Sequence, residues 1–325
     1  MRDGGVGKLE LVRPDEVRRA ADRISGHVVR TPLLPSEPLG RESGRDVRLK
    51  LESLQQAGSF KLRGALNFLA GARSERPRKG VVTFSSGNHG QAVALAARLH
   101  HLPAVIVMPV TVPAGKRRGA ERLGASIVLE GTTSLERQAR AEAIAAAEGF
   151  ELVPPFDHPL IIAGQGTCAL EALEDWPELD TWIVPIGGGG LGAGSAVALR
   201  AFRPGIRIVG VEPEGAASMR ASIDAGRPVT LERTDTIADG LAPVRPGALT
   251  FHHVVELFDD VVTVSDSAIL DATRFLLHTH KLVVEPSGAA ALAGLREGAL
   301  PEPGERVVCV VSGGNLEPSL LGELL

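Results

Sequence analysis

Short apolar runs alternate with longer amphipathic stretches along almost the whole chain. The short runs are rich in valine and isoleucine, as β-strands are, and the longer stretches repeat their apolar positions at the helical period. We expect strands at residues 47–51, 80–84, 104–108, 126–129, 181–185, 207–211, 261–264 and 306–311. The pattern predicts helices between them, at 91–99, 114–123, 135–148, 166–174, 191–202, 268–279 and 288–295. Residues 213–246 follow neither period, and we expect an irregular insertion there.

The order of these elements predicts the fold class. Several strand candidates are continuous apolar runs instead of alternating ones, which indicates burial on both faces of a sheet. Strands that alternate with helices form mainly parallel sheets covered by helices. We therefore expect an α/β fold with two lobes, in which residues 80–153 form a small lobe and residues 1–79 and 154–325 form a large one.

Composition and charge argue against several classes of protein. The chain of 325 residues is 44% hydrophobic, with 38 glycines and 22 prolines, as expected of a turn-rich globular protein large enough for two cores. Its formal net charge of −4 and its lack of a long basic run argue against nucleic-acid binding. No apolar stretch approaches a membrane span and the start does not resemble a signal peptide. Cys168 and Cys309 are too few for a disulfide framework, so we expect a cytoplasmic protein.

Lys61 stands in a setting that suits an amine nucleophile. It follows Ser59 and Phe60, and residues 65–70 after it are good helix formers. The dipole at the start of a helix disfavours a cation, which helps to keep the amine of such a lysine neutral. A neutral amine is the form that condenses with a carbonyl group. The ordinary alternative is an exposed lysine with no role, and the motifs described next argue against it.

A run of four glycines, Gly187, Gly188, Gly189 and Gly190, separates a predicted strand from a predicted helix. Successive glycines let backbone N–H groups converge on an anion, and the helix start adds a favourable dipole, so phosphate is the expected ligand. The segment also matches the dinucleotide pattern G-x-G-x-x-G, with Glu212 about 20 residues beyond its last glycine. A dinucleotide-dependent (NAD) oxidoreductase is therefore an alternative, although it leaves Lys61 without a role.

Two polar turns follow other predicted strands. The first contains Ser85, Ser86, Asn88 and His89 at the start of a helix, where hydroxyls, an amide and backbone N–H groups can bind a carboxylate. Taken alone, its serines and asparagine could be helix caps, and His89 could be a structural histidine. In the second turn, Ser312 could offer a hydrogen bond to a ring nitrogen, or the turn could simply end its strand.

Together these motifs resemble one family of enzymes. The segments concerned are Ser59–Ala65, Ser85–Gln91, Pro155–Asp157, Ile161–Thr167, Gly187–Gly190 and Ser312–Asn315. In this order and register, over roughly residues 15–320, the chain resembles the pyridoxal-phosphate enzymes of fold type II, and within them the serine/threonine dehydratase and serine racemase family. The resemblance implies a homodimer that uses pyridoxal 5′-phosphate.

The resemblance also implies roles for the site residues. Lys61 would hold the cofactor covalently and, once released, take the α-proton of the substrate. The other implied cofactor contacts are Gly187, Gly188, Gly189 and Gly190 with its phosphate, Asn88 with its ring hydroxyl, Phe60 with its ring and Ser312 with its pyridine nitrogen. The implied substrate contacts are Ser85, Ser86, Asn88 and His89. Ser86 could instead act as a second base on the opposite face of the α-carbon, which would permit racemisation.

One departure from the family concerns a divalent cation. Many members bind one through a glutamate, a backbone carbonyl and an aspartate, and the matching positions here are Glu212, Ala216 and Ser218. The loss of one carboxylate weakens a site for a hard cation. We therefore expect no metal, with Glu212 and Ala216 as weak candidates.

The expected activity is the β-elimination of a β-hydroxy amino acid. L-Threonine or L-serine would give 2-oxobutanoate or pyruvate, plus ammonia. The alternatives are a racemase for serine or a related amino acid, the NAD-dependent oxidoreductase, and a ligand-binding sensor without catalytic activity.

Overall fold

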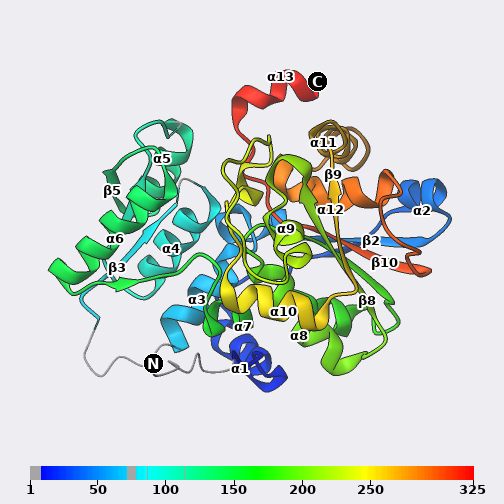
Figure 1. Ribbon diagram of the computed structural model, residues 1–325, viewed down its shortest axis with the longest axis horizontal. Helices are drawn as coiled ribbons and strands as arrows, with labels where there is room; N and C mark the ends of the chain where they lie inside the picture. The colour runs from blue at the N-terminus through cyan, green and yellow to red at the C-terminus, as the bar shows by residue number, and fades with distance from the viewer. Residues whose placement is uncertain (1–8, 72–77, 86, 113) are drawn as a thin grey trace.

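The computed structural model describes residues 9–71, 78–85, 87–112 and 114–325, and contains two sheets (Figure 1). The larger sheet has the order β1-β2-β10-β7-β8-β9, and all its neighbouring strands are parallel except the antiparallel pair β1–β2. Its strands are β1 (Leu33–Pro35), β2 (Asp46–Leu51), β7 (Thr181–Pro185), β8 (Arg207–Pro213), β9 (Asp260–Val264) and β10 (Arg306–Val311).

The smaller sheet is parallel throughout and has the order β5-β4-β3-β6. Its strands are β3 (Val81–Phe84), β4 (Ala104–Met108), β5 (Ser126–Leu129) and β6 (Glu151–Leu152). The predicted α/β class is confirmed, and each of the eight predicted strands is present. The prediction missed β1 and β6, which are too short to show a period.

Helices cover both faces of the larger sheet. Those that contribute buried residues to its two cores are α1 (Pro14–Ile24), α7 (Pro159–Asp175), α8 (Gly190–Phe202), α9 (Ser218–Asp224) and α10 (Ala248–Leu257) on one face, and α2 (Glu37–Ser43), α11 (Asp266–His280) and α12 (Pro286–Arg296) on the other. Successive strand residues point to opposite faces, so Trp182 and Val184 of β7 belong to the first core and Ile183 to the second. The wholly buried β7 explains why this strand reads as a continuous apolar run.

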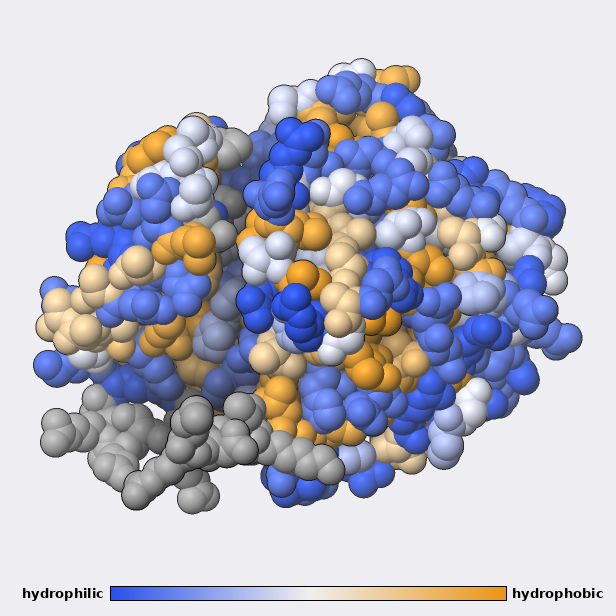
Figure 2. Space-filling model, viewed as in Figure 1, coloured by the Kyte–Doolittle hydropathy of each residue, from blue (hydrophilic) through white to orange (hydrophobic). Residues whose placement is uncertain are grey.

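The smaller sheet is also covered on both faces. Buried residues of α3 (Lys61–Gly71), α4 (Asn88–Leu99) and α5 (Ala114–Arg122) pack on one face, and α6 (Ser134–Glu148) packs on the other. In Figure 1 this sheet and helices α4–α6 lie to one side of the larger sheet. The space-filling view shows the surface hollowed between these two parts (Figure 2).

Several elements differ from the prediction, which missed α2 and α10 and placed the starts of α4 and α12 two to three residues late. Residues 213–246 are not wholly irregular, because they contain α9 (Ser218–Asp224). Helix α7 begins at Pro159 rather than at residue 166, and the His158 ring caps it by accepting a hydrogen bond from the Leu160 N–H at 3.1 Å. The α1 helix was missed, although Val17, Ala20 and Ile24 form its buried stripe. The remaining short helix is α13 (Leu321–Leu324), and within the described ranges no helix is long and apolar enough to cross a membrane.

Candidate active site

Lys61 is the first residue of α3, and the backbone before it is bonded to the turn that follows β10. The Phe60 N–H donates to the Ser312 carbonyl at 3.2 Å, and the Gly314 N–H donates to the Gly58 carbonyl at 2.8 Å. These bonds fix where the helix begins. The Lys61 ammonium donates to the Pro155 carbonyl at 3.1 Å and lies 5.1 Å from the centre of the Phe60 ring.

The surroundings of Lys61 favour its neutral form. Burial lowers the pKa of the Lys61 ammonium to about 8, and the Glu285 carboxylate opposes this shift without cancelling it. A substantial fraction of the amine is therefore unprotonated near pH 8. The predicted nucleophile thus has the protonation state that attack on a carbonyl requires.

The four glycines lie between β7 and the start of α8, and their surroundings are crowded. A Cβ atom on Gly188 would lie 2.2 Å from the Phe156 ring, and Gly189 has a φ of +93°. The Thr250 hydroxyl donates to the Gly188 carbonyl at 2.6 Å, which fixes the turn from the side of α10. This tight turn before a helix provides the backbone cradle that a phosphate needs.

The segment Pro155–Asp157 links the glycine turn to Lys61. Pro155 accepts the bond from the lysine, and Phe156 lies against Gly188. The Asp157 carboxylate accepts hydrogen bonds of 2.9–3.0 Å from the first N–H groups of α10, those of Ala248, Leu249 and Thr250. Three consecutive residues therefore hold the amine, the glycine turn and the helix behind that turn.

Asn88 is held from both sides at the start of α4. Its side-chain oxygen accepts a hydrogen bond from the Asn315 amide at 2.7 Å, and its nitrogen donates to the Glu285 carboxylate. The second hydrogen on that nitrogen remains available to a ligand. These contacts assign the amide orientation and join α4 to the larger part of the molecule.

Glu285 is a site residue that the sequence analysis missed. It is 5% exposed, and burial raises the pKa of its carboxyl to about 7, although the bond from Asn88 opposes the shift. The only signal in the sequence is an acidic residue directly after an apolar pair, before Pro286. Such a residue is easily read as the cap of the next helix.

Two more of the predicted residues, Ser85 and His89, lie in this part of the structure. The Ser85 hydroxyl accepts a hydrogen bond from the Gly87 N–H at 3.2 Å, and Ser86 lies outside the described residues. His89 is 4% exposed, and one ring nitrogen lies 3.2 Å from the Val153 carbonyl. Burial, reinforced by nearby Lys61, lowers the pKa of His89 to about 3, so its ring is neutral and donates to that carbonyl.

Ser312 lies beneath the start of α3. It is 3% exposed, and its hydroxyl makes a long bond of 3.4 Å to the Ser287 carbonyl. A hydroxyl in so weak a bond can turn to a better partner. The fit of a phosphorylated aldehyde cofactor is therefore favourable on three counts: a partly neutral amine, a glycine cradle and a hydroxyl for a ring nitrogen.

Glu212 fits neither the ribose of a dinucleotide nor a divalent cation. The carboxylate is fully buried and accepts hydrogen bonds of 2.8 Å from the N–H groups of Met219 and Arg220, which cap α9. It is thus unavailable to the ribose of a dinucleotide. The neighbouring Ser218 is buried with a hydroxyl that has no partner, and supplies no charge for a cation. No group of three or more acidic, histidine or cysteine side chains suited to a metal occurs among the residues that the structure describes.

The chain was compared with known proteins. The family described as pyridoxal-phosphate dependent enzyme matches residues 24–313. An L-threonine ammonia-lyase of Thermotoga maritima is 39% identical over 315 residues, which cover 97% of this chain and 78% of that protein. An L-threo-3-hydroxyaspartate ammonia-lyase of a Pseudomonas species is 40% identical over 317 residues, or 98% and 99% of the two chains. The structure of maize serine racemase superposes with a TM-score of 0.93 at 40% identity and covers 97% of both chains.

Proposed function

This chain belongs to the pyridoxal-phosphate dependent enzyme family, and we propose that it catalyses the β-elimination of L-threonine or L-serine. The products are 2-oxobutanoate or pyruvate, with ammonia. The observation that carries the proposal is the partly buried Lys61 amine, which has a pKa of about 8 and is bonded to the Pro155 carbonyl, next to the Phe156 ring that lies against the glycine turn. The ammonia-lyase names of the two relatives support elimination over other reactions of the family.

We propose that Lys61 holds the cofactor and that the glycine turn binds its phosphate. The N–H groups of Gly187–Gly190 and the start of α8 supply the donors, and Phe60 packs against the ring. The Asn88 amide donates to the ring hydroxyl, and the Ser312 hydroxyl donates to the ring nitrogen. Bound there, pyridoxal 5′-phosphate supplies an electron-withdrawing system that stabilises negative charge on the substrate α-carbon.

The protein's own part in the reaction is binding and proton transfer. Ser85, Ser86, Asn88 and His89 bind the substrate carboxylate at the positive end of α4. Lys61, when released by the substrate amine, takes the α-proton in its neutral form. Ser312 is a neutral donor and does not protonate the ring nitrogen, which limits the lifetime of charge on the α-carbon and favours rapid loss of the β-hydroxyl.

Serine racemisation is the second candidate, supported by the likeness to maize serine racemase. It requires a base on the face of the α-carbon opposite Lys61, and we propose Ser86 for that role. Ser86→Ala should abolish racemisation of serine and preserve a measurable elimination. Racemisation at the wild-type rate in this variant would exclude Ser86 as the second base.

We further propose the arrangement in which the site works. Residues 80–153 form a small lobe and residues 1–79 and 154–325 a large lobe, and their closure excludes water from the reacting carbon. The chain acts as a homodimer in the cytoplasm.

Absorption spectra and product assays test the proposal. The purified chain with pyridoxal 5′-phosphate should show a visible band that Lys61→Ala abolishes and that the exposed-lysine control Lys79→Ala retains. The L- and D-forms of serine, threonine and 3-hydroxyaspartate are then offered, with oxo-acid release and change of configuration as readouts. A band and turnover that survive Lys61→Ala would contradict the proposal.

A further inference from the structure

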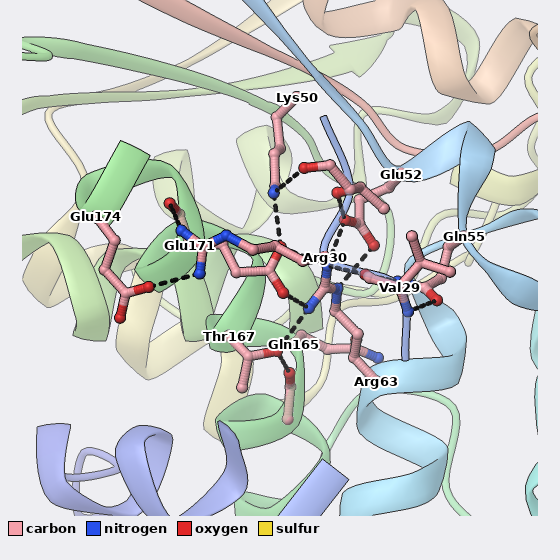
Figure 3. Close-up of polar contacts among 12 residues, drawn as sticks. Val29, Arg30, Lys50, Glu52, Gln55, Arg63, Gln165, Thr167, Glu171 and Glu174 are labelled. Carbon is pink, nitrogen blue, oxygen red and sulfur yellow. Dashed lines mark hydrogen bonds and ion pairs between the residues drawn. The ribbon is translucent and has the colours of Figure 1, made fainter. Parts of the chain in front are cut away.

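Four charged side chains are buried together behind the start of α3. Lys50 and Glu52, at the end of β2 and just beyond it, meet Arg63 of α3 and Glu171 of α7 (Figure 3). The side chains of Lys50, Glu52 and Arg63 are 0% exposed and that of Glu171 is 13% exposed. Two cations and two carboxylates leave this buried ion cluster without net charge.

Arg63 is the centre of the cluster, and two carboxylates hold its guanidinium. Glu52 accepts from Nε and Nη2 at 2.8 Å each. Glu171 accepts from Nη1 at 2.6 Å and from Nη2 at 2.9 Å. Paired bonds to two edges of a planar group fix both its plane and its rotation within that plane.

The other hydrogen bonds of the cluster connect Arg63 to three parts of the chain. Lys50 Nζ donates to Glu171 at 2.6 Å and to the Thr31 carbonyl at 2.7 Å, and the Thr31 hydroxyl donates to Glu52. The cluster thus binds the end of β2, the segment before β1 and helix α7 to a single side chain of α3.

Stability is a poor explanation for such a cluster. Taking four charges out of water costs free energy that their mutual attraction only partly returns, and well-packed apolar side chains of similar volume are commonly as stable or more so. Charged side chains form hydrogen bonds of defined geometry, whereas apolar side chains do not. The role of the buried ion cluster therefore follows from what the Arg63 guanidinium orients.

Arg63 lies two residues after Lys61, in the first turn of α3. Its backbone N–H donates to the Phe60 carbonyl at 3.0 Å, and the Gly64 N–H donates to the Gln165 side chain at 3.2 Å. The backbone before the lysine is bonded to the Ser312 turn. Lys61 therefore sits between two anchors, and among them the cluster holds the first turn of the helix from the side of β2 and α7.

We propose that Arg63 is a positioning residue for Lys61: the buried ion cluster sets the rotation of the first turn of α3 and so aims the lysine amine at the cofactor aldehyde. Arg63 contacts neither the cofactor nor the substrate and acts through the backbone that it shares with Lys61. The inference rests on the proposed role of Lys61 as the cofactor lysine.

The test compares two ligands that share the phosphate and differ in the reacting group. Pyridoxal 5′-phosphate carries the aldehyde that Lys61 attacks, whereas pyridoxamine 5′-phosphate carries an amine and cannot form the covalent link. The measured quantity is the Kd of the amine divided by the Kd of the aldehyde. A merely structural role for Arg63 weakens both ligands alike and leaves this ratio unchanged.

Two variants disturb the cluster and one serves as a control. Arg63→Met removes the planar fork, and a cavity of about 280 Å³ lined by Arg63, Thr167 and Glu171 among others admits water to the Glu171 carboxylate. We expect the ratio to fall at least tenfold. Glu171→Gln keeps the shape of the side chain and should lower the ratio at least threefold. Arg30→Met removes a half-exposed arginine that is paired with Glu174 and Asp175 and donates to the Glu171 backbone carbonyl at 3.2 Å, not to its carboxylate, and should leave the ratio within twofold of wild type.

Circular dichroism and thermal melting establish whether each variant is folded, and Glu171→Gln decides the matter should Arg63→Met fail to fold. A ratio within twofold of wild type in the folded variants would overturn the positioning role. The same measurement tests the role of Lys61 independently. If the ratio of the two Kd values in the wild type is no higher than in Lys61→Ala, Lys61 is not the cofactor lysine.

Discussion

The Asn88 side-chain amide donates a hydrogen bond to the Glu285 carboxylate, and this bond joins the first turn of α4 to the residue that precedes α12. Glu285 also acts on Lys61 through its charge. One buried carboxyl group therefore orients an amide on one side of the site and influences the protonation of the amine on the other. Its own pKa, near 7, allows both effects to change within the physiological pH range.

The rate of covalent cofactor loading should follow the titration of Lys61. Its pKa in the folded chain is lowered from the ordinary 10.5 to about 8, so the reactive neutral amine is lost as the pH falls below 8. We expect the loading rate to drop roughly tenfold per pH unit below that point and to level above it. Stopped-flow absorption with pyridoxal 5′-phosphate measures this rate, and a rate still climbing at pH 10 would contradict the assignment.

Glu285→Gln should move this profile to lower pH. The substitution removes a negative charge that stabilises the Lys61 ammonium, so the pKa of the lysine falls below about 8. A glutamine oxygen can still accept from Asn88, which preserves the amide orientation. The surface variant Glu297→Gln is the matched control and should leave the midpoint in place. An upward shift in Glu285→Gln would mean that the sign of this interaction is wrong.

Gly188→Ala should weaken both phosphorylated ligands. The new Cβ would overlap the Phe156 ring, so either the ring or the glycine turn must move, and overpacking of this kind costs about 1–3 kcal/mol. We expect the Kd for pyridoxamine 5′-phosphate to rise about tenfold or more, measured by fluorescence titration. Gly205→Ala is the control, because beyond its two chain neighbours no described residue has an atom within 4 Å of the added Cβ. Equal affinities in the two variants would argue against the glycine turn as the phosphate site.

An ion pair crosses between the two parts of the molecule near the glycine turn. Lys116 of α5, 14% exposed, pairs with Asp239, 54% exposed, and the adjacent Gly240 carbonyl lies 3.2 Å from the Cβ position of Gly187. A partly exposed pair contributes about 0.3–1 kcal/mol. Lys116→Met and Asp239→Asn should each lower kcat/KM by up to about fivefold, and the double variant should be no worse than either. Fully additive losses would show that the pair has no joint role, and Arg117→Met on the exposed face of α5 is the control.

Activity should not depend on a divalent cation at Glu212. The carboxylate already caps α9, and Ser218 adds no charge beside it. After dialysis against a chelator we expect kcat/KM to change by less than about twofold. A larger loss of activity, reversed by Mg²⁺ or Ca²⁺, would show that the Glu212 carboxylate can leave the N–H groups of α9 and bind a cation.

The sequence by itself determined the fold class and the longer strands, and it predicted the central elements of the candidate site. Strands buried on both faces must be apolar throughout, so β7 and β10 could be read from composition alone. The glycine turn and Lys61 could be identified because their chemistry depends on neighbours in sequence. A backbone cradle needs consecutive glycines, and a lysine at a helix start needs the helix directly after it.

The tertiary structure decided the features that depend on partners far apart in the chain. Asn88 and Glu285 are 197 positions apart, and Arg63 meets Glu171 across 108. Helix α9 was missed because a carboxylate on β8, rather than a residue of its own, caps it. Local periodicity reports which face of an element is buried, but it carries no information about which charged group another element brings to that face. The path of the chain alone supplies that pairing, and with it the charged groups that surround the Lys61 amine.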